Sequence, residues 1–471
     1  MIPYFLLIGA FERDNFGDML FPKIIEKYFG SYPAFKAGLV GRDLTHIGGD
    51  IVVPVNDFFA GREDDLPFAV IHCGGETLTN LKSDGLAMNL ATKVFEEDRG
   101  LFSFCQEEIS EKLINSVSPF SYVYGSEDLA PKAKKKIPTL FISVGGSSLD
   151  LLSNNFDILE SLKRRLRQAR YLSVRDKKTL ELLHMYLGLK ADLYPDLAAI
   201  IHRTHKKEIA EASRLLSNKG LTPNRPYILF QINQVKILEY GLDILARKTA
   251  EIAKAQNMAI VLQPAGVASG HGSTELLRLL KERVEKLDPK ITVKIQEDRN
   301  LWLQVAVIAN SSCTIGTSLH VRIVSTAFER PRVSLPVGKV NRYIDTWVED
   351  DQPYDVSLED LPEAVARTMA TDPQKLKKAS TVLADKVEEG IEKMISRLNM
   401  PKPKPNRMQD QERMAGMAYS ALSLETERLR QATAMEVIEK EFYKRKLNGV
   451  LPKGSWKITN LIRKVAGYRK R

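Results

Sequence analysis

The sequence is poor in cysteine, with three in 471 residues. Cys73, Cys105 and Cys313 lie far apart, and no Cys-x-x-Cys pair occurs. This spacing argues against a disulfide framework and against a cysteine-based zinc site, and it is typical of a reducing compartment. We therefore expect a cytoplasmic protein.

Apolar runs long enough to cross a bilayer are also missing. The apolar start at residues 2–11 has no basic leader and no small-residue cleavage site, so it predicts a first β-strand rather than a signal peptide. The length of 471 residues is sufficient for two core-forming domains and an appendage.

The main body of the chain has no basic excess. The formal net charge is +10, yet residues 440–471 alone hold eleven lysines and arginines against one acid. Residues 1–439 are therefore formally neutral. A sequence pI of 9.2 reflects this tail, and it does not predict binding to nucleic acid.

The basic tail carries apolar residues among its charges. On a helix, Trp456, Leu461, Ile462 and Val465 would share a face flanked by lysine and arginine. That pattern is typical of an interfacial helix on anionic lipid. We expect residues 440–471 to contact the inner face of the plasma membrane peripherally. A solvated tail, or a helix packed on the body, is the alternative.

Short apolar runs alternate with helical stretches along the rest of the chain. This alternation predicts an α/β protein with parallel sheets covered by helices on both faces. A break near residues 200–224 divides the runs into two series, so we expect two Rossmann-like domains, residues 1–200 and 201–400, with a cleft between them. That arrangement resembles the GT-B architecture of many glycosyltransferases. Residues 401–471 are expected to form a helical, basic C-terminal extension. The predicted strands are 4–9, 68–73, 139–144, 171–174, 192–194, 227–231, 259–263, 292–294, 305–309, 313–315 and 332–335.

Two segments at predicted strand ends offer polar and glycine residues for a ligand. In Asn-Phe-Gly-Asp, Gly17 could take a positive φ, and Asn15 and Asp18 could cap a helix or bind hydroxyl groups. In Cys-Gly-Gly-Glu, Gly74 and Gly75 would let the backbone approach a ligand or make a tight turn before Glu76.

Three further strand ends follow along the first half. Ser-Val-Gly-Gly-Ser-Ser at 143–148 lacks the lysine and spacing of a P-loop, so ATP binding is not indicated. Ser-Val-Arg-Asp places Arg175 at the cleft with a guanidinium suited to phosphate or carboxylate, although a pairing with Asp176 that fixes the turn is the alternative. In Tyr-Pro-Asp-Leu-Ala, Asp196 is most readily a cap or a hinge residue.

The most informative segment is Ile-Gly-Thr-Ser-Leu-His-Val-Arg at 315–322. It predicts a strand end, a turn at Gly316 and Ser318, and a helix that carries His320 and Arg322. A parallel α/β sheet binds ligands at such positions, and the free N–H groups of a helix start favour anions.

Taken together, these segments resemble the polysaccharide pyruvyl transferase family, whose motifs they match in order over about residues 5–336. The resemblance implies a GT-B-like enzyme that uses phosphoenolpyruvate as co-substrate, with no cofactor and no metal. Its acceptor would be a sugar on a cell-surface polysaccharide or a lipid-linked precursor.

The resemblance also implies residue roles. His320 would be the catalytic acid, because imidazole titrates near neutral pH. The donor site would contain Gly316, Ser318, Arg322 and Arg175, and the acceptor site Asn15, Asp18, Gly74, Gly75 and Glu76. The pair His202 and His205 is expected to lie on the surface of a helix rather than to bind a metal.

One position departs from the family. Its closing motif commonly reads Arg-x-His, and the arginine position here is Ser318, which cannot supply a positive charge. Arg322 could replace that charge, Arg332 or Arg342 could reach in from later loops, or the donor could have been lost or changed.

Two alternatives to pyruvyl transfer follow. A GT-B glycosyltransferase would bind a nucleotide sugar in the second domain, near residues 263–270, Glu297 and Asp298. A non-catalytic relative would keep the fold without the reaction.

Overall fold

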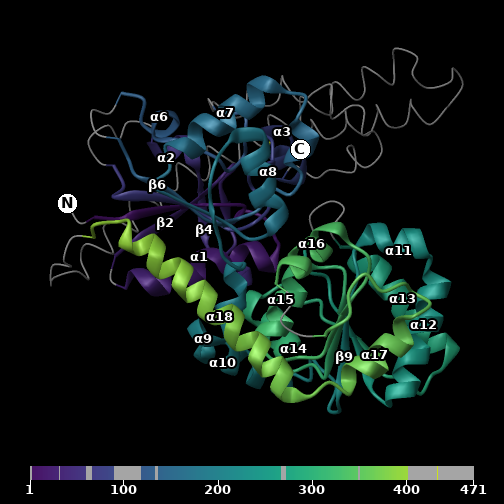
Figure 1. Cartoon of the computed structure of the whole chain (residues 1–471). Coiled ribbons are helices and arrows are strands. Elements are labelled where there is room, and N and C mark those ends of the chain that lie inside the picture. The colour runs from purple at the N-terminus through teal and green to yellow at the C-terminus, as the bar shows by residue number, and fades with distance from the viewer. Residues whose placement is uncertain are drawn as a thin grey trace, which may run out of the picture.

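The computed structural model describes residues 3–30, 32–59, 66–89, 118–132, 136–266, 272–347 and 351–400, and the single residue 432. It has two lobes, each built on its own sheet (Figure 1). The predicted extension at residues 401–471, including its membrane-binding helix, lies outside the described residues apart from that one position. None of the helices that the structure describes is long and apolar enough to cross a membrane.

The first lobe contains an eight-stranded sheet in the order β3-β4-β2-β1-β5-β6-β7-β8. All neighbouring strands pair in parallel except β3 and β4 at one edge. Five of these strands were predicted; β2, β3 and β4 were not. Polar and glycine residues interrupt β2 and β3, whereas β4 is apolar but only four residues long. The strands are β1 (Phe5–Ile8), β2 (Ala34–Gly38), β3 (Arg42–Asp43), β4 (Ile51–Pro54), β5 (Ala69–Cys73), β6 (Thr139–Val144), β7 (Tyr171–Val174) and β8 (Asp192–Leu193).

Helices cover both faces of this sheet. In β1, Phe5 and Leu7 pack into one apolar cluster while Leu6 and Ile8 pack into another, as expected from the two-residue repeat of a strand buried on both sides. The helices and 3₁₀ turns of the lobe are α1 (Phe16–Phe29), η1 (Thr45–Ile47), α2 (Val55–Phe59), α3 (Lys82–Asn89), α6 (Ser126–Leu129), η2 (Leu149–Leu152), α7 (Phe156–Arg167), α8 (Lys177–Leu187), η3 (Leu197–Ile200) and α9 (Ile201–Thr204).

The second lobe contains a five-stranded sheet in the order β11-β10-β9-β12-β13, with every pair parallel. Its strands are β9 (Tyr227–Gln231), β10 (Ala259–Leu262), β11 (Val293–Ile295), β12 (Cys313–Gly316) and β13 (Arg332–Ser334). Its helices are α10 (Lys206–Asn218), α11 (Gln234–Tyr240), α12 (Leu242–Gln256), α13 (Thr274–Leu287), α14 (Leu301–Ala309), α15 (Leu319–Ala327), α16 (Gly338–Thr346) and α17 (Leu361–Met369).

One predicted strand is wrong. Residues 305–309 form the second half of α14, which begins where the Asn300 side chain accepts from the N–H groups of Trp302 and Leu303. Nearly every residue of α14 is buried, so the segment has no polar face to reveal its helical period. A fully buried helix and a fully buried strand therefore look alike at this length.

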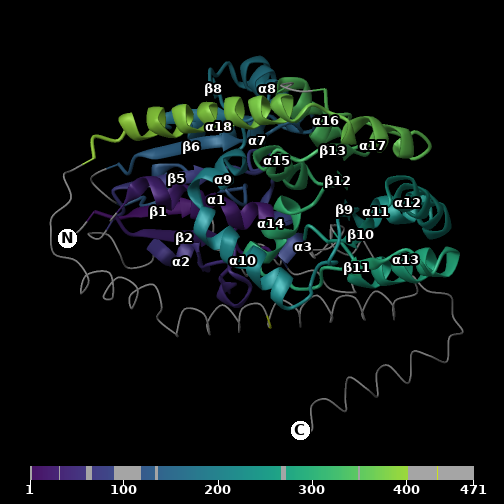
Figure 2. The same ribbon diagram turned by 90° about the horizontal axis from the view of Figure 1, so that it is seen from below.

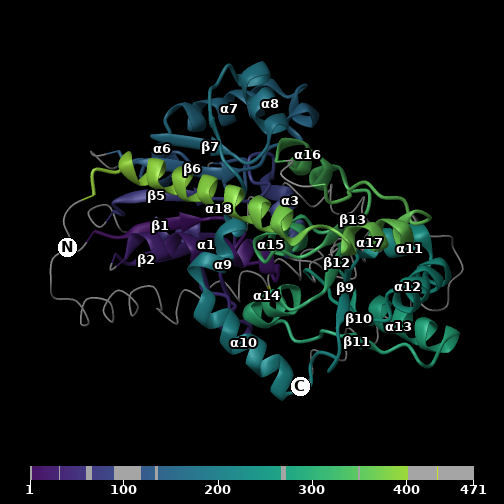
Figure 3. The ribbon, with the colours of Figure 1, turned by 60° about the horizontal axis from the view of Figure 1, so that its bottom comes forward.

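The last described helix, α18 (Pro373–Ser396), runs from the second lobe back across the first (Figures 2 and 3). The Ser380 hydroxyl donates to the Ala327 carbonyl of α15, at 2.9 Å. Further along, the Tyr171 hydroxyl donates to the Gly390 carbonyl, at 3.1 Å, and the Tyr194 hydroxyl to Glu389, at 2.9 Å. This helix therefore ties the two lobes together.

A single apolar core continues from one lobe into the other. It contains residues of α1 and η3 from the first lobe and of α14, α15 and α18 from the second. The contact between η3 and α15 is direct. This shared core holds the carboxyl ends of the strands of the two sheets toward each other, and a ligand site is expected there.

Candidate active site between the lobes

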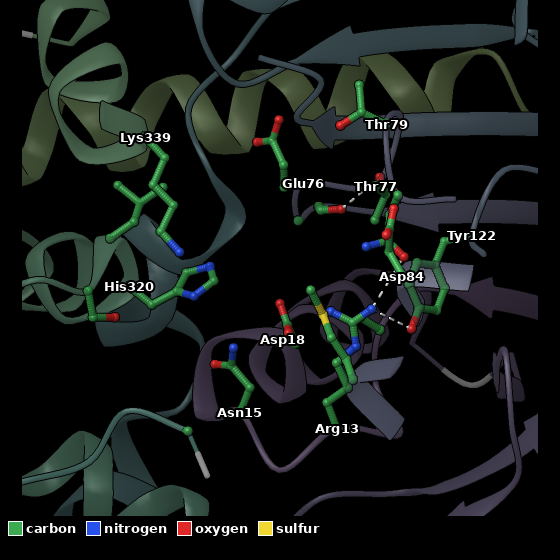
Figure 4. A pocket seen from close by; sticks show the side chains of 18 of the residues that line it. Arg13, Asn15, Asp18, Glu76, Thr77, Thr79, Asp84, Tyr122, His320 and Lys339 are labelled. Atoms are coloured by element: carbon green, nitrogen blue, oxygen red, sulfur yellow. Dashed lines mark hydrogen bonds between the residues drawn. The ribbon is translucent and has the colours of Figure 1, made fainter. Parts of the chain in front are cut away.

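A cavity of about 730 Å³ lies between the lobes, lined by loops that follow strands of both sheets. Figure 4 shows His320 and Lys339 on one side, Arg13, Asp84 and Tyr122 on the other, and Asp18 between them. We call these two sides the His320 end and the Arg13 end. Most of the predicted site residues line this cavity: Asn15, Asp18, Gly74, Gly75, Glu76, Arg175, Ser318 and His320.

A row of charged side chains connects four of the sequence motifs. The Arg175 guanidinium donates from Nη2 to Glu76 Oε2, at 2.9 Å, and from Nη1 to Asp196 Oδ2, at 3.0 Å. The same Asp196 oxygen lies 3.7 Å from His320 Nε2. Glu76 is held at its other oxygen by the N–H and hydroxyl groups of Ser147, at 2.6 and 3.0 Å. We call these four residues, Glu76, Arg175, Asp196 and His320, the charged row.

The charges within the row stabilise one another. Burial alone would lower the pKa of Arg175, but Glu76 and Asp196 raise it well above its ordinary value. Burial alone would raise the pKa of Asp196, but His320 and Arg175 outweigh burial and hold it below its ordinary value. Both groups are therefore ionised at neutral pH. Arg175 is paired with two carboxylates, so its capacity to bind a further anion is smaller than the sequence predicted.

His320 lies on the first turn of α15, and its ring packs against the N-terminus of α1. A Cβ atom placed on Gly17 would lie 1.8 Å from His320 Nδ1, which is an impossible contact. The ring also meets Phe21 edge to face, with centroids 5.5 Å apart. Gly17 has helical rather than positive φ, so the expected reason for this glycine is wrong. The position lacks a side chain because the imidazole occupies that space.

Lys339, which sequence reasoning missed, projects into the cavity beside His320 (Figure 4). It has no hydrogen-bond or ion-pair partner among the described residues. Its side chain is accessible to solvent within the cavity, but desolvation by the surrounding walls and the Arg175 cation lower its pKa, against the opposing effect of Asp18 and Glu76. The signal for this residue was its position shortly after β13, another strand end.

Asp18 faces the cavity from the first turn of α1, where Asn15 caps the helix by accepting from the Gly17 N–H, at 3.1 Å. The residue is 8% exposed, and its carboxylate accepts no hydrogen bond within the described part of the chain. Opposite it, Gly74 and Gly75 have φ of 55° and 74°, which only glycine adopts freely. This turn brings backbone to the cavity wall near Asp18.

The Arg13 end rests on a second buried network that the sequence did not reveal. Arg13 Nη2 donates to the Tyr122 hydroxyl, at 2.9 Å, and this hydroxyl donates to Glu12 Oε1, at 2.6 Å. Burial raises the pKa of Glu12 despite the Arg13 charge beside it. The loop that carries Arg13 is also anchored to the second lobe, because Asp14 forms an ion pair with Arg299, at 2.8 Å.

Two predicted donor residues do not reach the cavity. Arg322 points beneath α15, where it donates to the Ser334 hydroxyl and to the carbonyls of Pro353 and Gln352, at 3.0, 3.0 and 2.8 Å. Residues two apart on a helix point about 200° away from each other. Arg322 therefore lies on the opposite face of α15 from His320 and does not line the cavity. Gly316 also lies outside the lining; a Cβ there would meet Gln231 at 3.1 Å.

Ser318 lines the cavity and caps α15 by accepting from the Val321 N–H, at 3.4 Å. Arg332 and Arg342, the other arginines considered for the missing charge, are not among the lining residues. Lys339 is therefore the cation that the fold brings to the Ser318 side of the cavity.

His205 is buried and His202 is half-buried, whereas both were expected to lie on the surface of a helix. His205 stacks on Trp302, with centroids 4.9 Å apart, and His202 lies against Phe328. Burial lowers the pKa of each to about 4, so both are neutral at pH 7. Among the described residues no group of three His, Cys, Asp or Glu side chains could hold a metal ion.

A sequence model of the family described as polysaccharide pyruvyl transferase matches residues 15–338, which include every lining residue discussed above except Arg13 and Lys339. The chain belongs to the polysaccharide pyruvyl transferase family. Its members are transferases, and the matched region spans the cavity and the charged row.

Several solved structures are similar to this chain at low sequence identity, and the first one named here, with a TM-score of 0.50, indicates a shared fold. A UDP-N-acetylglucosamine 2-epimerase from Rickettsia bellii has 11% identity and a TM-score of 0.50, covering 84% of this chain and 96% of the other. The UDP-GlcNAc 2-epimerase of Methanocaldococcus jannaschii has 13% identity and a TM-score of 0.49, covering 81% and 98%. The wall teichoic acid polymerase TagF has 9% identity and a TM-score of 0.42, covering 84% and 90%. A search of curated proteins found no match.

Proposed function

We propose that this chain transfers a pyruvyl group from phosphoenolpyruvate to sugar hydroxyls of a cell-surface polysaccharide or its precursor. One observation carries the proposal: His320 and Lys339 share one side of the cavity and face the carboxylate of Asp18. Among the described residues, neither Lys339 nor the Asp18 carboxylate has a hydrogen-bond or ion-pair partner. A cation, an acid and a base are the groups that the reaction requires. Family membership supports the same reaction.

The His320 end suits an anionic donor. Phosphoenolpyruvate carries a carboxylate and a phosphate, and Lys339 offers a point charge to one of them. The N-terminus of α15 adds backbone N–H groups to the positive field. Ser318 replaces the family's arginine with a hydroxyl, and Lys339 supplies the charge from a different element. Arg175 contributes mainly by holding Glu76 and Asp196.

The chemistry can be assigned to side chains. Protonated His320 gives its proton to C3 of phosphoenolpyruvate, which leaves an oxocarbenium-like centre at C2. A sugar hydroxyl attacks C2 while Asp18 accepts the hydroxyl proton. The bond between C2 and the phosphate oxygen then breaks, and phosphate leaves with its electron pair. A second hydroxyl of the sugar attacks C2 and closes the ketal, and its proton passes to the departing phosphate. The Arg13 end, together with Asn15, Gly75 and Glu76, would hold the acceptor.

The glycosyltransferase alternative finds less support in the second lobe. Glu297, which that alternative would place near a nucleotide sugar, is engaged by Arg278 in a two-point ion pair, at 2.9 and 3.0 Å. Neither Glu297 nor Asp298 lines the cavity.

Thermal unfolding with added ligands tests the proposal without knowledge of the acceptor. Phosphoenolpyruvate at about 100 times its Kd should raise the free energy of unfolding by roughly 2.7 kcal/mol, more than equimolar phosphate does. The shift should vanish in Lys339→Ala, persist in Lys339→Arg, and be unaffected in Lys286→Ala, a control at an exposed lysine. If residues 318 and 339 can each supply the same positive charge, adding Ser318→Arg to the Lys339→Ala variant should restore the thermal shift with phosphoenolpyruvate.

The same panel separates the alternatives. A shift with a nucleotide sugar but none with phosphoenolpyruvate would support a glycosyltransferase. No shift with any of these ligands would support a non-catalytic relative.

We also propose that residues 440–471 bring the enzyme to the inner face of the membrane, near its acceptor. The charge of this segment in the sequence is the support for this proposal. Deletion of residues 440–471 should abolish most co-sedimentation with vesicles that contain anionic lipid and leave the weak binding to neutral vesicles unchanged. Equal sedimentation of the full and shortened chains with anionic vesicles would contradict it.

A further inference from the structure

We propose that Asp196 is a positioning residue that holds Nε2 of His320 and thereby leaves Nδ1 as the ring nitrogen that exchanges a proton with the substrate. The catalytic part of this inference rests on the proposed function. The structural part, that Asp196 holds Nε2 of His320, can be tested without any substrate.

The Asp196 carboxylate is fixed on every side. The residue has no exposed surface and lies at the start of η3, where the two lobes meet. Oδ1 accepts from the Ala198 N–H, at 3.0 Å, and Oδ2 pairs with Arg175 Nη1, at 3.0 Å. The Asp196 N–H donates to the Tyr343 hydroxyl of α16, at 3.3 Å. The carboxylate therefore cannot rotate away from His320.

His320 presents Nε2 to this carboxylate. The separation from Nε2 to Asp196 Oδ2 is 3.7 Å, and Nε2 is a buried atom with no hydrogen-bond partner in the described structure. An ionised carboxylate can only accept, so the nitrogen that faces it carries the hydrogen. A closing movement of under one ångström would complete the hydrogen bond, as often happens when a catalytic site binds its substrate. The remaining nitrogen, Nδ1, lies over Gly17 on the side of the α1 N-terminus.

Charged groups of both signs surround His320 on two sides. The charged row without His320 has two carboxylates and one guanidinium, so an imidazolium brings its formal charge to zero. On the cavity side, the Lys339 cation and the Asp18 carboxylate offset each other. The titratable groups that face the ring or its carboxylate from neighbouring elements are Glu76 after β5, Arg175 after β7, Asp196 before η3, Asp18 on α1, and Lys339 and Tyr343 on α16.

The contact between Asp196 and His320 crosses from one lobe to the other. Asp196 belongs to the first lobe and His320 to the second, and they meet because η3 packs on α15. The acid would therefore be oriented only when the two lobes share their core.

The first test is an NMR titration of the full-length protein with labelled histidine. The chain has seven histidines. The imidazole signal that is missing from the spectrum of the His320→Gln variant is assigned to His320. In the wild type, neutral His320 should be the tautomer with hydrogen on Nε2. Asp196→Asn should lower its titration midpoint by on the order of one pH unit, because the imidazolium loses an opposite charge, and should mix the two tautomers.

A matched control is Asp192→Asn, which removes a carboxylate four residues earlier that pairs with Lys393 instead, at 2.9 Å. It should leave the His320 signal unchanged. An identical midpoint and tautomer in the wild type and Asp196→Asn would overturn the inference. This arm uses no phosphoenolpyruvate, so its failure is distinct from a failure of the proposed function.

The second test measures pyruvyl transfer. Asp196→Asn should lower kcat on the order of 10²-fold, with little change in KM for phosphoenolpyruvate, and should move the pH optimum down. If that variant does not fold, Asp196→Glu keeps the charge but lengthens the side chain; it should keep the His320 midpoint and still lower kcat. Unchanged kcat in a folded variant would reduce Asp196 to a structural residue.

Discussion

Replacing His320 with glutamine is expected to lower the proposed pyruvyl transfer by about 10²- to 10⁴-fold, the usual effect of losing a general acid, which is the role proposed for His320. Glutamine has a similar volume and hydrogen-bonding capacity but cannot deliver a proton near neutral pH. The ring is mostly buried against Phe21 and Gly17, so the substitution should change the free energy of unfolding by only about 1 kcal/mol. Initial rates and a denaturant titration would measure the two effects.

The matched control is His184→Gln, at an exposed position on α8 far from the lining residues. It should retain full activity. A His320→Gln enzyme with wild-type turnover would remove His320 from the mechanism, whereas loss of both activity and folding would show that the histidine is mainly structural.

Replacing Gly17 with alanine is expected to lower turnover by about 10²-fold, although residue 17 touches no substrate in the proposed mechanism. The new Cβ would occupy the place of His320 Nδ1 and push the ring away from Asp196. A displacement of about 1 Å in a catalytic group can have an effect of this size. The free energy of unfolding should fall by about 1 to 3 kcal/mol, typical of overpacking.

A double-mutant cycle separates this mechanism from a simple effect on α1. Alanine at residue 17 should destabilise the wild type but not His320→Ala, where the space is free. In that background it should even stabilise α1 slightly, since alanine is the better helix former. Equal destabilisation in both backgrounds would show that the clash with His320 is not the cause.

The positions of the site elements were largely predictable from the sequence. Strand ends with glycine, aspartate or arginine mark where parallel sheets present ligand-binding loops, and Asn15, Asp18, Glu76, Arg175 and His320 all line the cavity. The local sequence determines where these strands end, because a buried apolar strand must end where polar and glycine residues begin.

The roles of individual arginines and lysines were not predictable in this way. Arg322 is only two residues from His320, yet its side chain lies beneath α15. Lys339 reaches the cavity from the first turn of α16, the helix that follows β13. Which face of a helix meets a cavity depends on what the helix packs against, and that partner comes from distant parts of the chain.

The sequence by itself determined the fold class, the two series of strands, most strand ends and the family. Only the tertiary structure decided that Arg175 is held by two carboxylates, that Asp196 lies next to His320, and that Gly17 is small because His320 covers it. The physical reason is that periodicity and turn chemistry act between near neighbours, whereas charge pairing and close packing act between residues that folding brings together.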